Sequence, residues 1–422
     1  MGVSAGLPAR AAALTVLTEV LRQRRPLDAA LAATAGLDQR DAGFARAIAG
    51  ETLRRLGQLD AVIRGFVPKP PARNRAGPVP EILLAAACEL LFLDVPAHAA
   101  VDGANRLAQA DLKAVHFKPL INAVLRRVAR EGKPIVAAQD AARLNTPDWL
   151  WERWCAGYGE ATARAIAASH LRVPPLDIVA RDKPPGDAVP LFGSVWRLQP
   201  ARVDALPGYA EGAWWVQDAA ATLPVRLLGE VRDRRVLDLC AAPGGKTAQL
   251  AAAGAQVTAV ERDKMRAAQL RENLDRLHLP AALVIADMRD YRTSAPLVLL
   301  DAPCTATGTI RRHPELPWIK NAADITLCAQ VADELLGCAA DLTMPGGLLV
   351  FSTCSLEPEE GTEQVAAFLR RRTEFVREPV HLEEAFGHAE FIDGNGDLRT
   401  LPCHLAERGG MDGFYAARLR RL

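Results

Sequence analysis

Two cysteines in the C-terminal half of the chain lie in segments that could carry out nucleophilic chemistry. The segments are Asp301-Ala302-Pro303-Cys304 and Ser352-Thr353-Cys354-Ser355. A cysteine thiolate is a strong nucleophile and is easily expelled again, so it suits transient addition to carbon 6 of a pyrimidine, which makes carbon 5 reactive toward a methyl donor. A carboxyl group beside the ring nitrogen would stabilise the charge that builds up during this attack, and Asp301 could have that role. Residue types alone do not distinguish the roles of Cys304 and Cys354, and inert buried cysteines are the alternative.

A glycine-rich turn earlier in this half predicts a site for a nucleoside. The apolar run Val236–Leu239 is followed by the turn Cys240-Ala241-Ala242-Pro243-Gly244-Gly245-Lys246-Thr247. Position 240 is Cys, so the turn lacks the first glycine of an NTPase phosphate loop. Its two glycines are adjacent, which excludes the dinucleotide fingerprint G-x-G-x-x-G.

Two acidic residues complete this candidate site. Glu261 closes the second predicted strand and could accept hydrogen bonds from ribose hydroxyls, as acidic residues do in dinucleotide sites. Asp287 follows the third predicted strand and could accept a hydrogen bond from an adenine amino group. A nucleoside site without a phosphate requirement fits S-adenosyl-methionine better than NAD or ATP. The alternative is a structural turn with surface acids.

Alternating strands and helices must position these residues. Apolar runs predict strands at 236–239, 257–260, 282–285, 297–300, 348–351 and 414–419, with helices at 248–253 and 264–277. This order predicts a doubly wound, mostly parallel sheet. Ligands bind such sheets at the carboxyl ends of the strands, so we expect the glycine-rich turn and both cysteine segments at that edge.

The N-terminal half predicts helices instead. From Pro8 to Gly132 apolar residues recur at helical spacing, which predicts an all-α bundle. Basic residues that could contact phosphate, or could cover a solvated helix face, are Arg22, Arg24, Arg25, Arg126, Arg127 and Arg130. Between 145 and 210, a tryptophan-rich helix and short strand-like runs predict a small α+β module. Its aromatic residues are expected in a core, with stacking on single-stranded bases as the alternative.

Length and composition limit the class of protein. The 422 residues, 45.4 kDa, are enough for two or three domains. Apolar residues make up 50%, charged residues 24%, and the mean hydropathy is +0.02, which is typical of a folded chain and excludes one that is mostly disordered. No apolar run is long enough to span a bilayer, and the N-terminus lacks the apolar core of a signal peptide, so we expect no membrane association and a cytoplasmic location.

Charge and cysteine content restrict the partners further. The net charge of +1 means that any nucleic-acid contact must come from local basic patches. The eight cysteines include no CxxC pair, so neither a zinc site nor a disulfide framework is expected.

Three N-terminal motifs resemble a known RNA-binding domain. Val95–Val101, Asn105–Ala108 and Ile121–Arg127 are similar to motifs of the NusB-like helical domain. The resemblance implies RNA binding or docking and contributes no catalytic residue.

The C-terminal motifs resemble the RNA 5-methylcytosine methyltransferases of the Sun/Fmu family. The matching residues are Cys240–Thr247, Asp301–Gly308, Arg311–Pro314, Thr353–Ser355 and Pro358–Glu360. The resemblance implies a Rossmann-like class I methyltransferase domain with S-adenosyl-methionine as cofactor, and it is closest to members that methylate a cytosine in 16S ribosomal RNA. Together the motifs imply a multidomain chain, with an all-α NusB-like domain at 1–140, a small α+β linker module at 141–212 and an α/β methyltransferase domain at 213–422.

The same resemblance implies roles for individual residues. The S-adenosyl-methionine site would be lined by Cys240, Ala241, Ala242, Pro243, Gly244, Gly245, Lys246, Glu261, Asp287 and Asp301. Cys354 would be the nucleophile that bonds carbon 6, and Cys304 would assist proton removal or product release. Arg311, Arg312 and His313 would hold RNA phosphate near the site, with a solvated turn as the alternative.

Two residues depart from the family pattern. Glu261 stands where the family usually has Asp, and its extra methylene still permits a bidentate ribose contact. Gly361 follows Glu360 where Asn is common, which leaves the outer hydrogen bonding of the Cys354 loop open.

The expected partner is ribosomal RNA, naked or incompletely assembled. The target base must leave its stack to reach a thiolate and a methyl donor together. No metal ion or ATP is needed for this reaction, and we expect a monomer. The alternatives are methylation of transfer RNA or 23S ribosomal RNA, methylation of an amino nitrogen or a protein, and a non-catalytic RNA-binding or antitermination factor. The intact cysteines, Asp301 and glycine-rich turn argue against the last of these.

Overall fold

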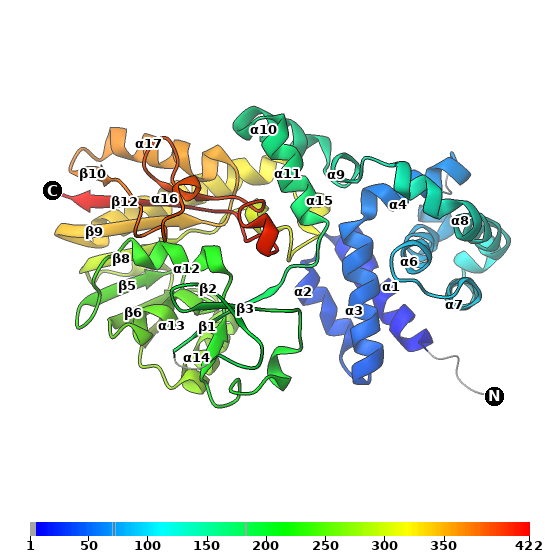
Figure 1. Ribbon diagram of the computed structural model, residues 1–422, viewed down its shortest axis with the longest axis horizontal. Helices are drawn as coiled ribbons and strands as arrows, with labels where there is room; N and C mark the ends of the chain where they lie inside the picture. Colours follow the sequence, from blue (N-terminus) through cyan, green and yellow to red (C-terminus); the bar gives the residue numbers. More distant parts are fainter. Residues whose placement is uncertain (1–5, 70, 72, 182–183) are drawn as a thin grey trace. The chain divides into compact units, whose positions relative to one another are not determined.

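The computed structural model describes residues 6–69, 71, 73–181 and 184–422 (Figure 1). The contacts divide the chain into two compact units. The helical unit contains the residues up to Leu171 together with His313–Asn321, and the sheet unit contains Arg172–Arg312 and Ala322–Leu422. The boundaries of the three predicted domains remain a prediction, and residues 1–5 of the first predicted domain lie outside the described residues. Over the described ranges, no helix is long and apolar enough to cross a membrane.

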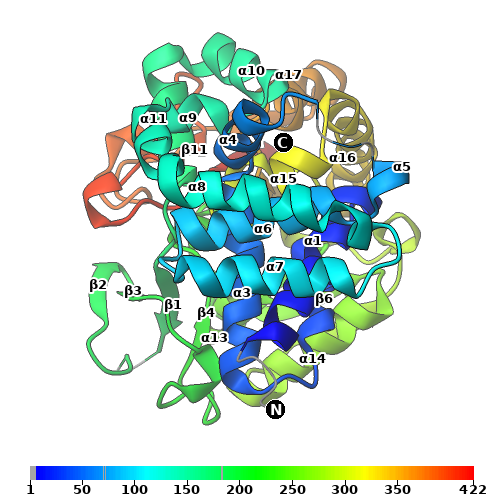
Figure 2. The same ribbon diagram turned by 90° about the vertical axis from the view of Figure 1, so that its right-hand side faces the viewer.

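The helical unit is an all-α bundle around one buried helix. Its helices are α1 (Leu7–Gln23), α2 (Leu27–Ala30), α3 (Gln39–Arg54), α4 (Leu56–Phe66), α5 (Arg73–Ala76), α6 (Val79–Leu91), α7 (Ala97–Gln109), α8 (Lys118–Ala138), α9 (Ala141–Leu144), α10 (Asp148–Tyr158), α11 (Glu160–His170) and α15 (Leu316–Ile319). Helix α6 is apolar on nearly all sides and buries most of its residues, because α7 and α8 pack against it (Figure 2), as do α3 and α4. In α10, Trp154 is 1% exposed, as expected for a core residue, whereas Trp149 and Trp151 are only partly buried.

One short segment joins the helical unit from far along the chain. Residues His313–Asn321, which carry α15, pack there rather than in the sheet unit. The indole of Trp318 donates a hydrogen bond to the carbonyl of Leu53 at 2.9 Å, and Ile319 lies 5% exposed in the core formed by α1 and α3. The guanidinium of Arg24 donates to the carbonyl of Ile319 at 2.7 Å. The chain therefore leaves the sheet unit after Arg312 and returns to it at Ala322.

The sheet unit begins with a small antiparallel sheet. Its strands are β1 (Leu176–Ala180), β2 (Val189–Phe192), β3 (Val195–Leu198) and β4 (Trp214–Val216), in the order β2-β3-β1-β4. Asp177 and Arg197 lie opposite each other on β1 and β3 and form a buried ion pair at 2.7 Å. This sheet corresponds to the strand-like part of the predicted α+β module.

The large sheet has the predicted doubly wound architecture. Its strands are β5 (Arg235–Leu239), β6 (Gln256–Glu261), β7 (Ala282–Ile285), β8 (Ala295–Asp301), β9 (Thr343–Thr353), β10 (Phe375–Glu378), β11 (Leu398–Thr400) and β12 (Phe414–Arg421). The order is β10-β12-β9-β8-β5-β6-β7, with β11 paired to β12. Strands β5 to β9 are parallel, whereas β12 runs antiparallel to β9. The strand order reverses at β5, which places the glycine-rich turn at the switch point of the sheet.

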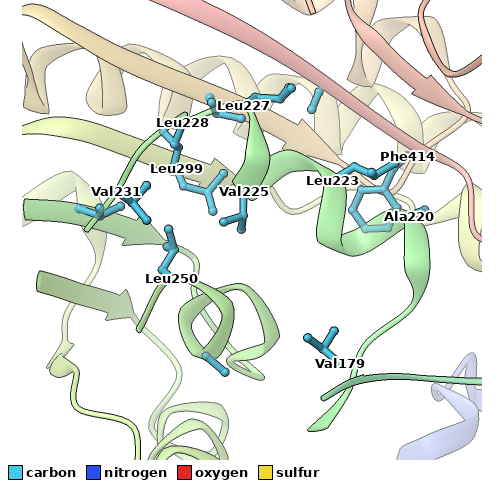
Figure 3. Close-up of a cluster of buried hydrophobic side chains, with 14 of the residues drawn as sticks. Val179, Ala220, Leu223, Val225, Leu227, Leu228, Val231, Leu250, Leu299 and Phe414 are labelled. Carbon is cyan, nitrogen blue, oxygen red and sulfur yellow. The ribbon is translucent and has the colours of Figure 1, made fainter. Parts of the chain in front are cut away.

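Helices cover both faces of this sheet (Figure 1). They are α12 (Ala219–Arg226), α13 (Gly245–Ala252) and α14 (Lys264–Leu277) on one face, and α16 (Ala322–Leu342) and α17 (Thr362–Arg371) on the other. Alternate residues of each strand point to opposite faces, so Leu299 belongs to the apolar cluster that includes Val225 and Leu228 on the first face (Figure 3), while Leu300 packs under α16 on the second. Both faces are therefore buried, as expected for parallel strands.

Candidate active site

The glycine-rich turn connects β5 to α13 through two left-handed residues. Cys240 has φ 60° and Gly244 has φ 104°, and α13 begins directly after Gly244. A Cβ on Gly244 would lie 3.0 Å from the side chain of Leu270, so glycine is favoured by both conformation and space. Burial raises the pKa of Cys240 to about 12, so this cysteine is a thiol rather than a nucleophile.

Glu261 points its carboxylate back at this turn. The backbone amide of Ala242 donates to Oε2 at 3.2 Å and that of Asp263 donates to Oε1 at 2.9 Å. The residue is 3% exposed, and the longer side chain reaches the turn from the end of β6. Each carboxylate oxygen has a second lone pair, so ribose hydroxyls can still donate to this group.

Asp287 lies at the start of the turn that follows β7. It caps residues 288–290, and the guanidinium of Arg289 donates to both carboxylate oxygens, at 2.9 and 2.6 Å. These bonds with Arg289 lower the pKa of Asp287 to about 2. The carboxylate is thus a permanent acceptor, and its contact with an adenine amino group stays a prediction.

Asp301 is held by two groups from neighbouring elements. Lys246 of α13 donates from Nζ to Oδ2 at 2.7 Å, and the hydroxyl of Ser352 at the end of β9 donates to Oδ1 at 2.9 Å. Lys246 is 9% exposed and its ammonium lies 4.9 Å from the ring centre of Phe414. Asp301 itself is 32% exposed, so a carboxylate of fixed orientation faces the space above the sheet.

The two predicted cysteines are neighbours. The Sγ atoms of Cys304 and Cys354 lie 3.5 Å apart at the carboxyl ends of β8 and β9. The hydrogen bond with Cys354, together with burial, raises the pKa of Cys304 well above its ordinary value. Cys304 therefore keeps its proton near neutral pH and can donate it toward the sulfur of Cys354.

A buried carboxyl group joins the two cysteine loops. Glu360 accepts hydrogen bonds from the backbone amide of Thr305 at 2.8 Å, from its hydroxyl at 2.5 Å and from the hydroxyl of Ser355 at 2.5 Å. The amide of Gly308 donates to the carbonyl of Cys354 at 2.9 Å, which adds a direct bond between the loops. A Cβ on Gly308 would lie 2.1 Å from the carbonyl oxygen of Gly413 and 2.8 Å from that of Cys354, so this glycine is in close contact with both the Cys354 loop and the segment before β12.

At Gly361, where the family commonly has Asn, another side chain occupies the space beside the backbone. Arg399 of β11 places Nη2 at 2.9 Å from the point that a Cβ on Gly361 would occupy. Its Nη1 donates to the carbonyl of Ser355 at 2.7 Å, and its guanidinium lies 4.9 Å from the ring centre of Tyr415. Arg399 thus supplies hydrogen bonding to the Cys354 loop from the space where a longer residue 361 would lie.

The structure separates the three basic residues that were expected to hold phosphate. Arg311 is 2% exposed and lies 3.3 Å from Asp218 and 3.4 Å from Asp412, so its burial contradicts a role in direct phosphate binding. Arg312 also pairs with Asp412 but is 34% exposed. His313 lies in the helical unit, near Glu315.

A pocket of about 340 Å³ opens beside the glycine-rich turn. Its lining includes Lys246, Asp301 and Arg312, and it continues to residues of β4 and α14. Sequence reasoning missed those residues and the Thr305 and Ser355 partners of Glu360. Thr305, Ser355 and Glu360 did have a signal, because they lie in the motifs Asp301–Gly308, Thr353–Ser355 and Pro358–Glu360. The residues of β4 and α14 lie in no such motif.

Comparisons with known proteins agree along the whole chain. A family described as 16S rRNA methyltransferase RsmB/F matches residues 225–420, and the NusB family matches residues 7–130. The ribosomal RNA small subunit methyltransferase B of Pseudomonas putida is 36% identical over 98% of both chains, and that of Pasteurella multocida is 32% identical over 99% of this chain and 96% of the relative.

Two solved structures have similar folds. The structure titled PH0851 matches with a TM-score of 0.77 and 23% identity, covering 100% of both chains. The structure of NSun6 from Pyrococcus horikoshii with SFG matches with a TM-score of 0.56 and 20% identity, covering 65% of this chain and 98% of that one. At these identities the two structures support the fold alone.

Proposed function

Because the chain belongs to the RsmB/F family of 16S rRNA methyltransferases, we propose that it methylates carbon 5 of a cytosine in 16S ribosomal RNA. It is an RNA methyltransferase with S-adenosyl-methionine as its cofactor. The finer claims are the base, the carbon and a covalent route through Cys354. The observation that carries them is the pair of thiols 3.5 Å apart beside a carboxylate that Lys246 and Ser352 hold in place.

The chain's own residues fit the cofactor. The buried Glu261 carboxylate retains free lone pairs beside the turn, as two ribose hydroxyls require. The residues proposed to hold the cofactor are Cys240–Lys246, Glu261, Asp287 and Asp301. When bound, S-adenosyl-methionine supplies an electrophilic methyl group for carbon 5.

Cys354 begins the reaction in this proposal. Its thiolate adds to carbon 6 of the flipped cytosine, and the electron pair of the carbon 5–carbon 6 double bond moves toward the ring nitrogen and carbon 5. The Lys246–Asp301 pair holds a proton beside the ring nitrogen while that charge builds up. Carbon 5 is then nucleophilic and able to accept the methyl group.

Cys304 acts in the second half of the reaction. After methylation, Cys304 gives its thiol proton to the departing Cys354 sulfur and takes the proton from carbon 5, whose bonding electrons re-form the double bond as the sulfur leaves carbon 6. The Cys304 thiol lies within hydrogen-bonding distance of that sulfur and stabilises the departing thiolate. Cys304 therefore assists proton removal or product release.

The first experiment identifies the product. Purified protein and methyl-labelled S-adenosyl-methionine are incubated separately with naked 16S RNA, 23S RNA and transfer RNA, and the labelled nucleoside is identified after digestion. We expect 5-methylcytidine in 16S RNA alone. The same nucleoside in another RNA would overturn the ribosomal substrate and keep the chemistry, whereas label in any other nucleoside would contradict the thiolate route.

The second experiment assigns the two cysteines. Cys304→Ala should accumulate a protein–RNA adduct that survives denaturing gel electrophoresis, because release from carbon 6 is slowed. Cys354→Ala should form no adduct, and Cys155→Ala in α10 is the matched control that should behave as the wild type. The reverse pattern would exchange the roles of Cys304 and Cys354, and full activity of Cys354→Ala would favour methylation of an amino nitrogen.

A further inference from the structure

The pocket beside the active site extends beyond the groups that the reaction uses. Its volume of about 340 Å³ falls within the usual range for sites that enclose a drug-sized ligand. Beyond Lys246 and Asp301, its lining includes Tyr209, Asn273 and Arg276. Tyr209 belongs to the loop before β4, and the other two residues lie on α14. None of these three side chains has a role in the proposed methyl transfer.

Arg276 presents a fixed guanidinium plane in this extension. Its Nη1 donates to the carbonyl of Tyr209 at 2.7 Å and to that of Trp214 at 3.3 Å. The guanidinium lies 4.0 Å from the ring centre of Tyr209. Among the described residues, Nη1 is the only nitrogen of this guanidinium with a hydrogen-bond acceptor. Arg276 is thus ordered by the protein, its Nε is buried, and the two N–H donors of Nη2 remain for a ligand.

The neighbouring backbone holds this arrangement in place. A Cβ on Gly212, which has φ 69°, would lie 2.0 Å from the carbonyl oxygen of Arg276, so the loop before β4 is pressed against the end of α14. Asn273 donates from Nδ2 to the carbonyl of Pro243 in the glycine-rich turn at 3.1 Å. Its amide oxygen has no donor among the described residues. The extension is therefore joined at one side to the cofactor turn and at the other to the small sheet.

We propose that this extension binds the nucleotide next to the target cytosine in the RNA chain, with its base stacked on the Arg276 guanidinium. Single-stranded RNA bases are commonly recognised by stacking on aromatic rings or guanidinium planes, with hydrogen bonds to their edges. Asn273 supplies an acceptor for a base amino or imino group, and the free donors of Arg276 suit a carbonyl or phosphate oxygen. This inference rests on the proposed function.

The part of the pocket that is lined by Tyr209, Asn273 and Arg276 contains none of the residues proposed to hold the cofactor. The two carboxylates proposed to hold ribose and adenine, Glu261 and Asp287, do not line the pocket. Ala241–Lys246 of the cofactor turn and Asp301 do line it, and of these Lys246 and Asp301 also act on the target base in the proposed reaction. A nucleotide adjacent to that base is therefore within reach of Arg276 in the same cavity.

The first test compares variants of α14. Arg276→Ala is expected to raise KM for RNA about tenfold and to leave KM for S-adenosyl-methionine unchanged, since loss of one base-stacking contact typically costs between a few-fold and a hundredfold in affinity. Arg276→Lys, which keeps the charge and loses the plane, should be nearly as impaired as Arg276→Ala. Asn273→Ala, which leaves Arg276 in place, tests the pocket if Arg276→Ala fails to fold. Arg271→Ala is the matched control, because it removes an exposed positive charge from the same helix outside this pocket.

The second test removes the base instead of the side chain. RNA with an abasic nucleotide on either side of the target cytidine is compared with intact RNA for the wild type and for Arg276→Ala. At one of the two positions, the abasic nucleotide should raise the KM of the wild type for RNA about tenfold and leave the KM of Arg276→Ala unchanged. The reason is that the missing base and the missing guanidinium remove the same contact. If the loss from the abasic nucleotide and the loss from Arg276→Ala multiplied at both positions, the proposed subsite would be overturned. An Arg276→Ala variant with a raised KM for the cofactor alone would also overturn it. Absence of methyl transfer to any RNA by the wild type would instead contradict the proposed function on which the subsite rests.

Discussion

Replacing Glu360 should separate the two cysteine loops. This buried carboxyl group accepts three hydrogen bonds, from the amide and hydroxyl of Thr305 and from the hydroxyl of Ser355. Glu360→Ala removes both acceptor oxygens and all three hydrogen bonds, and leaves a buried amide and two buried hydroxyls without this partner. Each unsatisfied buried group costs about 1–3 kcal/mol, and a hydroxyl can turn toward another acceptor, so we expect a loss of roughly 3–6 kcal/mol in the free energy of unfolding.

Glu360→Gln is the variant to compare with Glu360→Ala, because it removes the charge and keeps groups that can form hydrogen bonds. The amide oxygen can still accept from the Thr305 backbone, and the amide nitrogen can donate to the two hydroxyl oxygens after they rotate. Burial raises the pKa of Glu360, so removing its charge also removes a desolvation cost. We expect Glu360→Gln to lose no more than about 1.5 kcal/mol.

Two measurements check this reasoning. The free energy of unfolding is measured in urea, and methyl transfer is measured in a single turnover, where displacement of the cysteines by about 1 Å should slow Glu360→Ala roughly 100-fold. Glu363→Ala is the control, because this exposed glutamate three residues further on has no partner among the described residues. If Glu360→Ala matched Glu360→Gln in both stability and rate, the carboxyl group would not be what holds the loops together.

Three further predictions follow from contacts around the site. Gly308→Ala should lower the free energy of unfolding by at least about 1–3 kcal/mol and abolish most of the methyl transfer, because its surroundings leave no space for a Cβ. Gly337→Ala, which lies in open space on α16, should raise the free energy of unfolding by about 0.5–1 kcal/mol. Thermal unfolding of the two variants checks this difference. Burial raises the pKa of Asp238 from 3.8 to about 7, so its contribution to stability is complete below pH 4 and is lost as the pH rises through 7. Asp238→Asn should abolish that decline, which amounts to at most about 4 kcal/mol, and equal pH slopes of the variant and the wild type in urea unfolding between pH 5 and pH 8 would contradict this. Gly361→Asn should displace Arg399 and lose about 1–2 kcal/mol, and a double-mutant cycle with Arg399→Ala should show that the two losses do not add.

Most of the large sheet could be predicted from the sequence, because each of its central strands is a continuous apolar run between turns. The strands at 236–239, 257–260, 282–285 and 297–300 lie within β5 to β8. Periodicity could not give the direction of β12, since a strand buried on both faces has the same apolar pattern whether it runs parallel or antiparallel. The NusB-like and Rossmann-like parts were both predicted, and the comparisons confirm them.

The site was predictable only in part. The spacing of the strands indicated that Cys304 and Cys354 would come together, because strand ends meet at one edge of the sheet. Local chemistry could not assign their separate roles, because both lie at strand ends, and that assignment stays a proposal. Arg311 was expected at the surface because it lies in a basic turn, but two aspartates from distant segments, Asp218 and Asp412, bury it. Pairings across such sequence distances leave no periodic signal.

The return of residues 313–321 to the helical unit means that no single cut divides this protein into two intact parts. A fragment that ends at Leu171 would lack Trp318 and Ile319, which complete its own core. A fragment that begins at Arg172 would carry those two side chains without their partners. The helical unit therefore cannot be removed as one continuous stretch of the chain, because it includes residues 313–321. Truncation, domain exchange and recombination in this family must keep both units together or replace α15 along with the N-terminal helices.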